Sequence, residues 1–324
     1  MTARAVFQAP FCSSFRTVIR NPARVAAVIA LWCAVTAASA AGFTFAALGD
    51  APYYDHEEQA FFDMIGEMNA EPLAFAVHVG DFKSGYSECG DALYQQRKEW
   101  FNLSRHPFVL VPGDNDWTDC WRALAGRYDP RERMQKLREV FYADAESLGE
   151  RRLPLTRQSD RDVQRPYPEH ARWIHERVVF ATLNVPGSDN NFARDRAEHQ
   201  ERDAAVREWI SAAFRLAREQ KLAAVVLIMQ ANPWSVTGPR RAAFARFFET
   251  LISETLDFSG EVVLIHGDTH RYRVDQPLRH PEARRPIRNF TRIEVFGSPS
   301  VNWVRVRVED VDGKLKFEAT PAGQ

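Results

Sequence analysis

The sequence predicts an α/β or α+β layered fold built on a mixed β-sheet. The first observation is that short apolar runs alternate with helix-like spacing from Phe43 to Ile265. The second is a change of pattern after His270, where polar and apolar residues alternate as in antiparallel strands with one solvated face. With 45% hydrophobic and 26% charged residues, the composition is that of an ordinary globular protein.

Apolar runs predict the strands, and the stretches of helical spacing between them predict the helices. The expected strands cover 43–48, 73–79, 108–111, a pair within 172–184, 222–229 and 262–265. The expected helices cover 55–69, 91–103, 130–143, 194–220 and 239–256. Residues 146–170 are rich in Arg, Pro and Asp without periodicity, which indicates an exposed insertion. The residues expected on the solvated face of the last strands are Arg292, Glu294, Trp303, Arg305 and Arg307.

Residues 1–40 have the make-up of a secretory signal peptide. They contain four arginines and no acid, and an apolar run of 17 residues, Val25 to Ala41, includes the small-residue pattern Ala38-Ser39-Ala40. An uncleaved membrane anchor is the alternative, although a spanning helix needs about 20 residues. We therefore expect a signal peptide at 1–40 and a single domain at 41–324. The protein is then exported, periplasmic or secreted, monomeric and without a stable membrane span.

Charge and cysteine content narrow the classes of function. The chain has 42 basic and 43 acidic residues, so it lacks the basic excess of a protein that coats nucleic acid. Without residues 1–40 the balance is 38 to 43, a net charge of −5. The cysteines that remain are Cys89 and Cys120, which usually pair in an oxidising compartment. Two unpaired buried cysteines are the alternative.

Aspartates follow several of the expected strands. Three successive strands end in Gly-Asp, at Asp50, Asp81 and Asp114, and the strand ending at Ile265 is followed by Gly267-Asp268-Thr269-His270. Because the carboxyl ends of strands form the ligand crevice of open α/β sheets, we expect these side chains to converge. Divalent cations are the most economical explanation for several carboxylates in one crevice. Helix capping by each aspartate is the alternative, and it explains one such motif better than four.

The motifs resemble, in order and spacing, those of the calcineurin-like metallophosphoesterases. They are Gly49-Asp50-Ala51-Pro52, Gly80-Asp81-Phe82, Gly113-Asp114-Asn115-Asp116 and Gly267-Asp268-Thr269-His270. The resemblance runs from about Phe43 to His270. It implies a four-layer αββα sandwich of two mixed sheets flanked by helices. It also implies a two-metal site at which a metal-activated hydroxide hydrolyses phosphate mono- or diesters.

The resemblance further implies a set of site residues. The positions that match metal ligands of the family are Asp50, Asp81, Asp114, Gln230, Asp268 and His270. Asp81 matches the aspartate that bridges both metals. The positions that match catalytic roles are Asn115, Asp81 and His270.

The chain departs from the family's pattern at several of these positions. Asp114 stands where an asparagine is usual, and Gln230 and Asp268 stand where histidines are usual. Pro52 replaces a first-motif histidine, and Asn115 replaces the histidine that commonly serves as the acid or stabilises the transition state. An amide cannot donate a proton as a general acid, but it can donate a hydrogen bond to a phosphoryl oxygen.

The substitutions make the expected site rich in carboxylates. Four aspartates carry a formal charge of −4, which two divalent ions balance. Such hard oxygen ligands favour Mn or Mg, with Ca or Fe as alternatives, over Zn. The expected substrate is a small-molecule or surface phosphoester. The alternative function is a non-catalytic exported protein that binds metal or phosphate on the same fold.

Overall fold

The computed structural model of the protein describes residues 42–161 and 166–322. All elements given below belong to one compact unit, Ala40–Gln324. The signal peptide expected at 1–40 lies outside the described residues. Within the described part of the chain, no helix is both long and apolar enough to cross a membrane.

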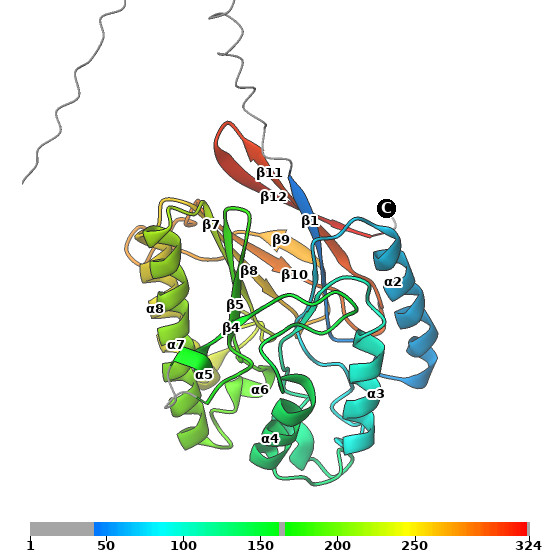
Figure 1. Cartoon of the computed structure of the whole chain (residues 1–324). Coiled ribbons are helices and arrows are strands. Elements are labelled where there is room, and N and C mark those ends of the chain that lie inside the picture. The colour runs from blue at the N-terminus through cyan, green and yellow to red at the C-terminus, as the bar shows by residue number, and fades with distance from the viewer. Residues whose placement is uncertain (1–41, 162–165, 323–324) are drawn as a thin grey trace, which may run out of the picture. The chain divides into compact units, whose positions relative to one another are not determined.

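Two mixed β-sheets form the centre of the molecule (Figure 1). The strands of the five-stranded sheet, in order across it, are β12 (Lys314–Pro321), β11 (Val304–Val311), β1 (Phe43–Leu48), β2 (Ala76–His78) and β3 (Phe108–Leu110). Those of the seven-stranded sheet are β4 (Thr156–Arg157), β5 (Ala171–His175), β6 (Val178–Thr182), β7 (Ala224–Ile228), β8 (Glu261–His266), β10 (Phe290–Glu294) and β9 (Arg273–Asp275). Strands β1 to β3 run parallel, as do β6, β7, β8 and β10.

Helices cover both outer faces of the sheet pair. On the five-stranded sheet lie α2 (Glu58–Ala70), α3 (Asp91–Phe101) and α4 (Pro130–Phe141), with the 3₁₀ turns η1 (Asp55–Glu57) and η2 (Thr118–Trp121). On the seven-stranded sheet lie α7 (Arg196–Glu219), α8 (Ala245–Leu256) and η3 (Gly238–Phe244). The short helices are α5 (Gln158–Arg161) and α6 (Gly187–Asn190). Figure 1 shows α7 and α8 on one side of the strands and α2 and α3 on the other.

Three buried apolar clusters fill the spaces between the four layers. Side chains of a strand alternate between its faces, so Ala46 and Leu48 of β1 pack toward the helices, whereas Phe45 packs between the sheets. Against Phe45 lie residues of the second sheet, including Phe180, whose ring centroid is 5.4 Å away. The third cluster joins α7 and α8 to the outer face of the seven-stranded sheet. These clusters confirm the four-layer αββα sandwich.

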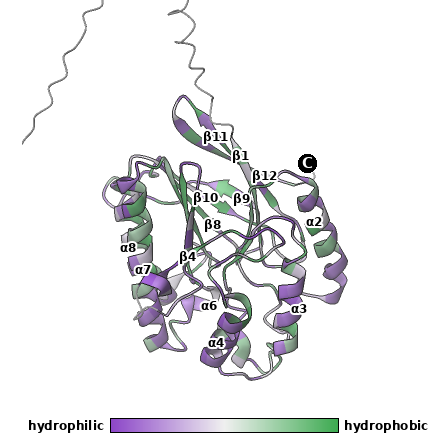
Figure 2. Ribbon diagram, in the orientation of Figure 1, coloured by the Kyte–Doolittle hydropathy of each residue, from purple (hydrophilic) through white to green (hydrophobic). Residues whose placement is uncertain are grey.

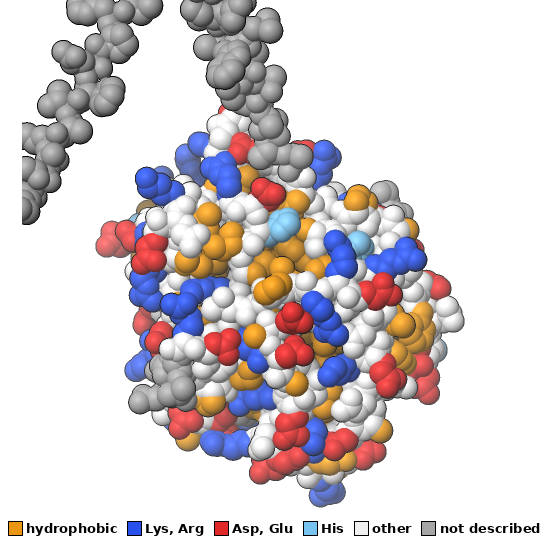
Figure 3. Space-filling view, in the orientation of Figure 1, with side chains coloured by type: hydrophobic (Ala, Val, Ile, Leu, Met, Phe, Trp, Pro, Cys, Tyr) orange, Lys and Arg blue, Asp and Glu red, His pale blue; other side chains and the backbone are white. Residues whose placement is uncertain are grey.

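Helix α7 illustrates how local sequence sets the helical layer. The side chain of Asp195 caps its N-terminus by accepting a hydrogen bond from the backbone N–H of Glu198. Buried residues then recur at helical spacing, as at Val206, Ile210 and Ala213. In Figure 2 the long helices carry both hydrophobic and hydrophilic residues, because each packs one face and exposes the other. On the face shown in Figure 3, acidic and basic side chains lie interspersed.

Two expectations about the chain's pattern are wrong. Residues 146–170 are not simply an exposed insertion, because they include β4 and α5 and bury Arg157, Gln158 and Glu169. Their polar composition hides this burial because ion pairs and hydrogen bonds satisfy the buried groups. Glu169, for example, accepts hydrogen bonds from Arg138 and Asn184.

Strand β10 is the second correction. It was expected to pair antiparallel with Arg292 and Glu294 in water. It does pair antiparallel with β9, but it runs parallel to β8, and both side chains are buried. Arg292 pairs with Asp275, and Glu294 pairs with Arg273. Buried charges with partners produce the same polar alternation as a solvated face, so the sequence pattern alone could not distinguish them. Strands β11 and β12 do pair antiparallel, and Arg307 is exposed as expected, but Trp303, also expected on the solvated face, is fully buried.

A disulfide joins Cys89 to Cys120, which confirms the pairing over two free thiols. Cys89 precedes α3 and Cys120 lies in η2, and both are fully buried. The bond therefore ties together the loops that follow β2 and β3.

We expect the double substitution Cys89→Ala and Cys120→Ala to lower the free energy of unfolding by about 3–4 kcal/mol, because the disulfide restricts the unfolded chain. Urea denaturation of the oxidised protein and of the double variant measures the difference. Adding a reductant to the double variant is the control and leaves its midpoint unchanged. Two reactive thiols in the denatured, unreduced protein that lacks residues 1–40 would contradict the pairing.

Candidate functional site

Six residues predicted as metal ligands lie at the carboxyl ends of parallel strands from both sheets. The loops after β1, β2, β3, β7 and β8 carry, in that order, Asp50, Asp81, Asp114, Gln230 and the pair Asp268 and His270. Because the two sheets stack with these ends side by side, residues more than 200 positions apart in the chain become neighbours.

Direct contacts bring these side chains into one cluster. The backbone N–H of Asp268 donates to both carboxylate oxygens of Asp50, at 3.1 Å each. The amide of Gln230 donates to Asp81 Oδ2 at 3.2 Å and also hydrogen-bonds Asp50. A Cβ on Gly187 would lie 2.7 Å from Asp114 Oδ1 and 2.9 Å from Asp268 Oδ1, which places those two carboxylates together. The convergence expected from the strand ends is therefore present.

His270 completes the cluster in a defined orientation. Its Nδ1 lies 2.8 Å from the carbonyl oxygen of Ser298, which can only accept, so Nδ1 carries the proton of the neutral ring. The unprotonated Nε2 then faces the interior, 3.7 Å from Asp50 Oδ1. A backbone carbonyl that fixes the imidazole in this way is typical of metal-binding histidines.

Tyr53 lies within the cluster, although no pattern in the sequence predicts a role for it. Its hydroxyl donates to Asp81 Oδ2 at 3.2 Å, lies 3.1 Å from His270 Nε2 and accepts from Asn115 Nδ2 at 3.2 Å. It follows Pro52, the position at which the family's first-motif histidine is missing. The hydroxyl of Tyr53, next to Pro52 in the sequence, thus places a polar atom between Asp81 and His270.

The backbone at the site adopts an unusual conformation. Asp50, Asp81, Asp268 and His270 all have positive φ, at 50°, 55°, 78° and 58°. For residues other than glycine this costs on the order of 1–3 kcal/mol each, so surrounding contacts must hold it in place. Such strain concentrates at functional sites.

Asp116 holds two of the site loops together. Its carboxylate accepts hydrogen bonds from the backbone N–H groups of Asp81, Phe82 and Gly113, at 2.7–3.0 Å. It is fully buried and lies in the motif that also carries Asn115. Asp116 therefore positions the loops after β2 and β3.

A left-handed turn approaches the cluster from the seven-stranded sheet. From Ser188 to Asn191 every φ is positive, between 46° and 63°. The hydroxyl oxygen of Ser188 lies 2.5 Å from Asp114 Oδ2 and 2.9 Å from Asp119 Oδ2, so its single proton is donated to one of these two carboxyl groups. The buried guanidinium of Arg202 holds the turn by donating to the side chain and backbone oxygens of Asn190. The contacts of Ser188 and Asp119 are long-range, and nothing in their local sequence predicts them.

Burial and mutual repulsion make the carboxylates hard to ionise. Burial, reinforced by the charge of Asp268, raises the pKa of Asp50 well above its usual range, and burial with the charge of Asp114 does the same to the pKa of Asp81. Burial also raises the pKa of Asp268 to about 7, with Asp114 adding to the effect, and the pKa of Asp119 to about 7. The buried ammonium of Lys83 acts on Asp81 and Asp116, but the pKa values of both carboxyls remain raised, so the described residues compensate the charge of the cluster only in part.

The donor types fit divalent metal ions. The cluster offers hard or borderline ligands. They are carboxylates whose ionisation is opposed by burial, an amide oxygen, and an imidazole nitrogen with a free lone pair. The side chains do not yet form a closed cage: within the described ranges, no three His, Cys, Asp or Glu side chains are arranged to hold a metal ion. The hydroxyl of Tyr53 and the amide of Gln230 instead donate to the carboxylate of Asp81.

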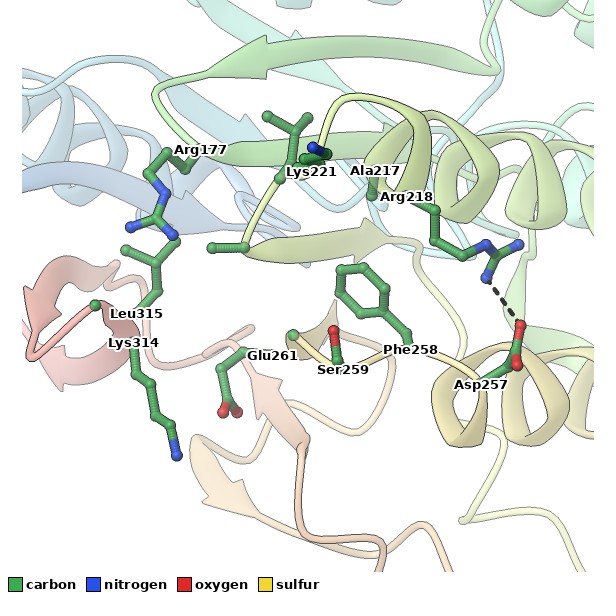
Figure 4. Close-up of a pocket in the computed structure, with 14 residues that line it drawn as sticks. Arg177, Ala217, Arg218, Lys221, Asp257, Phe258, Ser259, Glu261, Lys314 and Leu315 are labelled. Carbon is green, nitrogen blue, oxygen red and sulfur yellow. Dashed lines mark ion pairs between the residues drawn. The ribbon is translucent and has the colours of Figure 1, made fainter.

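A separate pocket lies away from the cluster. Its volume is about 510 Å³, and Figure 4 shows Arg177, Lys221, Glu261 and Lys314 among its walls. Arg177 precedes β6 and Glu261 begins β8, so the pocket lies at the amino ends of these strands, opposite the end that carries Asp268. None of the six predicted ligands lines it.

Comparison with solved structures identifies the fold. No model of a known protein family matches the sequence. No curated protein matches it either. The structure is similar to that of PhoD, with 11% identity, a TM-score of 0.53 and coverage of 88% of this chain and 69% of PhoD. The chain has the calcineurin-like metallophosphoesterase fold.

A second structure with this fold is purple acid phosphatase PPD1 from seeds of yellow lupin (Lupinus luteus), with 11% identity and a TM-score of 0.51. The match covers 88% of this chain and 52% of the lupin protein, so this chain corresponds to about half of that protein's length. The calcineurin-like fold agrees with the resemblance stated from the four sequence motifs, which lie at the site of converging strand ends.

We expect Gly113→Ala to lower the free energy of unfolding by about 1–3 kcal/mol, because its Cβ would lie 2.0 Å from Asp81 Oδ1 and 2.6 Å from Asp81 N. The matched control is Gly66→Ala in α2, where a Cβ meets nothing within 4 Å. Replacing that helical glycine raises the free energy of unfolding by up to about 1 kcal/mol. Urea denaturation measures both, and equal midpoints for the two variants would contradict the close packing of the Asp81 loop.

Proposed function

We propose that the protein is an exported, metal-dependent phosphoesterase that hydrolyses phosphate mono- or diesters. The observation that carries the proposal is the convergence of Asp50, Asp81, Asp114 and Asp268 in a largely buried cluster whose negative charge the buried Lys83 offsets only in part. The fold adds support, since the lupin protein that shares it is named a phosphatase. A buried group of carboxylates is costly unless cations balance it.

The residues that would hold two divalent ions are Asp50, Asp81, Asp114, Gln230, Asp268 and His270, with Mn or Mg favoured over Zn. When bound, such ions lower the pKa of water and polarise a phosphoryl oxygen. Asp81 lies centrally, in contact with both Gln230 and Tyr53, as a bridging role requires. His270 presents Nε2 because Ser298 fixes its Nδ1 proton.

Asn115 orients the substrate in this proposal. Its side-chain amide lies at the surface of the cluster, donates to the hydroxyl of Tyr53 and is 8% exposed as a residue. An amide N–H stabilises charge on an equatorial phosphoryl oxygen, but it does not protonate a leaving group. Substrates with acidic leaving groups, such as aryl phosphates, are therefore hydrolysed faster than alkyl phosphates.

Export is a separate part of the proposal. The basic and apolar segment at 1–40 has the pattern of a signal peptide, and the disulfide between Cys89 and Cys120 is of the kind that persists in oxidising compartments. The substrate is accordingly a phosphoester outside the cytoplasm.

We expect turnover of 4-nitrophenyl phosphate or its bis-ester to require added Mn²⁺ or Mg²⁺ and to fall about a hundredfold or more in Asp81→Asn. The reason is that the amide keeps the shape but loses the charge at the centre of the cluster. The matched control is Asp63→Asn on the exposed face of α2, which keeps full activity. Bound metal without turnover in the wild-type protein would favour the alternative, a non-catalytic metal- or phosphate-binding protein.

We expect Mn²⁺ to raise the melting temperature more at about pH 8 than at about pH 6, because protons compete with the metal for carboxylates. The raised pKa values of Asp50 and Asp81, and that of Asp268 at about 7, mean that the metal-free folded protein retains protons that the unfolded chain has lost. These groups therefore stabilise the metal-free fold less as pH rises.

Differential scanning fluorimetry with EDTA or with saturating Mn²⁺ at both pH values measures this effect. Metal at a concentration about a hundredfold above its dissociation constant raises the free energy of unfolding by about 2.7 kcal/mol. The Asp81→Asn variant shows a smaller shift. An equal shift at both pH values would speak against metal binding by these carboxylates.

A further inference from the structure

Two adjoining cavities lie beside the carboxylate cluster, on the side where Asp114 meets the left-handed turn. The nearer one, about 480 Å³, is bounded by Asp119, Arg122, Ser188 and Arg240, among others. The farther one, about 590 Å³, continues past η2 toward the start of α4. Trp121, Asn191 and Arg194 line both cavities. We call this continuous hollow the arginine groove.

The inner end of the arginine groove touches the proposed site. Ser188 and Asp119 line the groove, and the hydroxyl of Ser188 lies within hydrogen-bond distance of both Asp114 and Asp119. Arg122, also in the groove, lies against the same glycine as Asn115: a Cβ on Gly85 would be 2.5 Å from Arg122 Nη1 and 2.7 Å from Asn115 Oδ1. A molecule with one end at Asn115 therefore extends into the groove.

The groove offers cations that are not fully engaged. Arg122 pairs closely with Asp119, at 2.6 Å. Arg240, whose side chain is 66% exposed, reaches only 3.5 Å from Asp189. Arg194 has no acidic partner in the part of the chain that the structure describes, and its guanidinium lies 4.0 Å from the ring centroid of Trp121. An anion that enters the groove meets Arg194 and Arg240 without displacing a close ion pair.

The floor of the groove is apolar where the two cavities meet. Trp121 is 43% exposed and lines both cavities. A guanidinium stacked on an exposed indole presents its remaining N–H groups sideways, as in sites that bind planar anionic ligands. The side chains thus combine a flat apolar surface with positive charge.

We propose that the arginine groove binds the leaving group of the substrate, and that this leaving group carries a negative charge of its own on a planar body. The proposal rests on the proposed phosphoesterase function. The scissile phosphate lies at the carboxylate cluster and the second anionic group lies between Arg194 and Arg240. These two arginines determine specificity and take no part in the hydrolytic step.

The test compares 1,4-phenylene bisphosphate with phenyl phosphate, which has the same aryl ester but no second charge. We expect the wild-type protein to have a KM about threefold to tenfold lower for the bisphosphate. The double substitution Arg194→Gln and Arg240→Gln removes this preference and leaves kcat and KM for phenyl phosphate unchanged. The control Arg288→Gln, which removes an exposed arginine far from η2 in the sequence, keeps the preference.

A bisphosphate preference that survives in the double variant would overturn the proposal, as would an equal rise in KM for both substrates. Either result leaves the phosphoesterase function standing, because phenyl phosphate is still hydrolysed. If neither substrate is hydrolysed, the proposed function fails. Calorimetric titration with 1,4-phenylene bisphosphate then measures its binding to the groove directly. Tighter binding to the wild-type protein than to the double variant supports the groove, and equal binding overturns it.

Discussion

The constraint on which this structure depends is the burial of several like-charged carboxylates where two sheets meet. Asp50 and Asp81 are almost inaccessible to water, and their raised pKa values record the cost of placing them together. The protein meets part of that cost with directed hydrogen bonds, such as those from the backbone of Asp268 to Asp50. Hydrogen bonds from neutral donors reduce repulsion but do not cancel charge, and the divalent cations that we propose for this site would balance the remainder.

The surrounding architecture keeps these groups from relaxing apart. The loops that carry them adopt positive φ, Asp116 binds three backbone N–H groups across two loops, and a disulfide closes the same pair of loops on the far side. Glycines such as Gly113 and Gly187 admit carboxylates where a Cβ would collide with them. The positive φ values, the close packing at the glycines and the disulfide all lie in one small region. This is typical of sites whose geometry is maintained for binding at some cost in stability.

Much of the fold and the charged half of the site could be predicted from the sequence because both depend on local pattern. Apolar runs mark buried strands, and Gly-Asp at the strand ends marks Asp50, Asp81 and Asp114. Tyr53 and Ser188 were missed, because their significance comes from contacts with residues more than 25 positions away. Strand β10 was misjudged for a related reason: a buried Glu294 paired with Arg273 leaves the same alternation as a solvated face.

The departures from the family's motifs divide the site into two unlike halves. Asp114 and Asp268 stand where the matching motifs have neutral side chains, and there acidic groups gather next to the turn that carries Ser188. Where a histidine is missing, the neutral hydroxyl of Tyr53 lies between Asp81 and His270. The arginine groove adjoins the more acidic half, so its cations face excess negative charge, which their pairing with Asp119 and Asp189 only partly satisfies. If metal ions neutralised this half, Arg194 and Arg240 would attract an anion more strongly, so filling the site and binding a charged leaving group would reinforce each other.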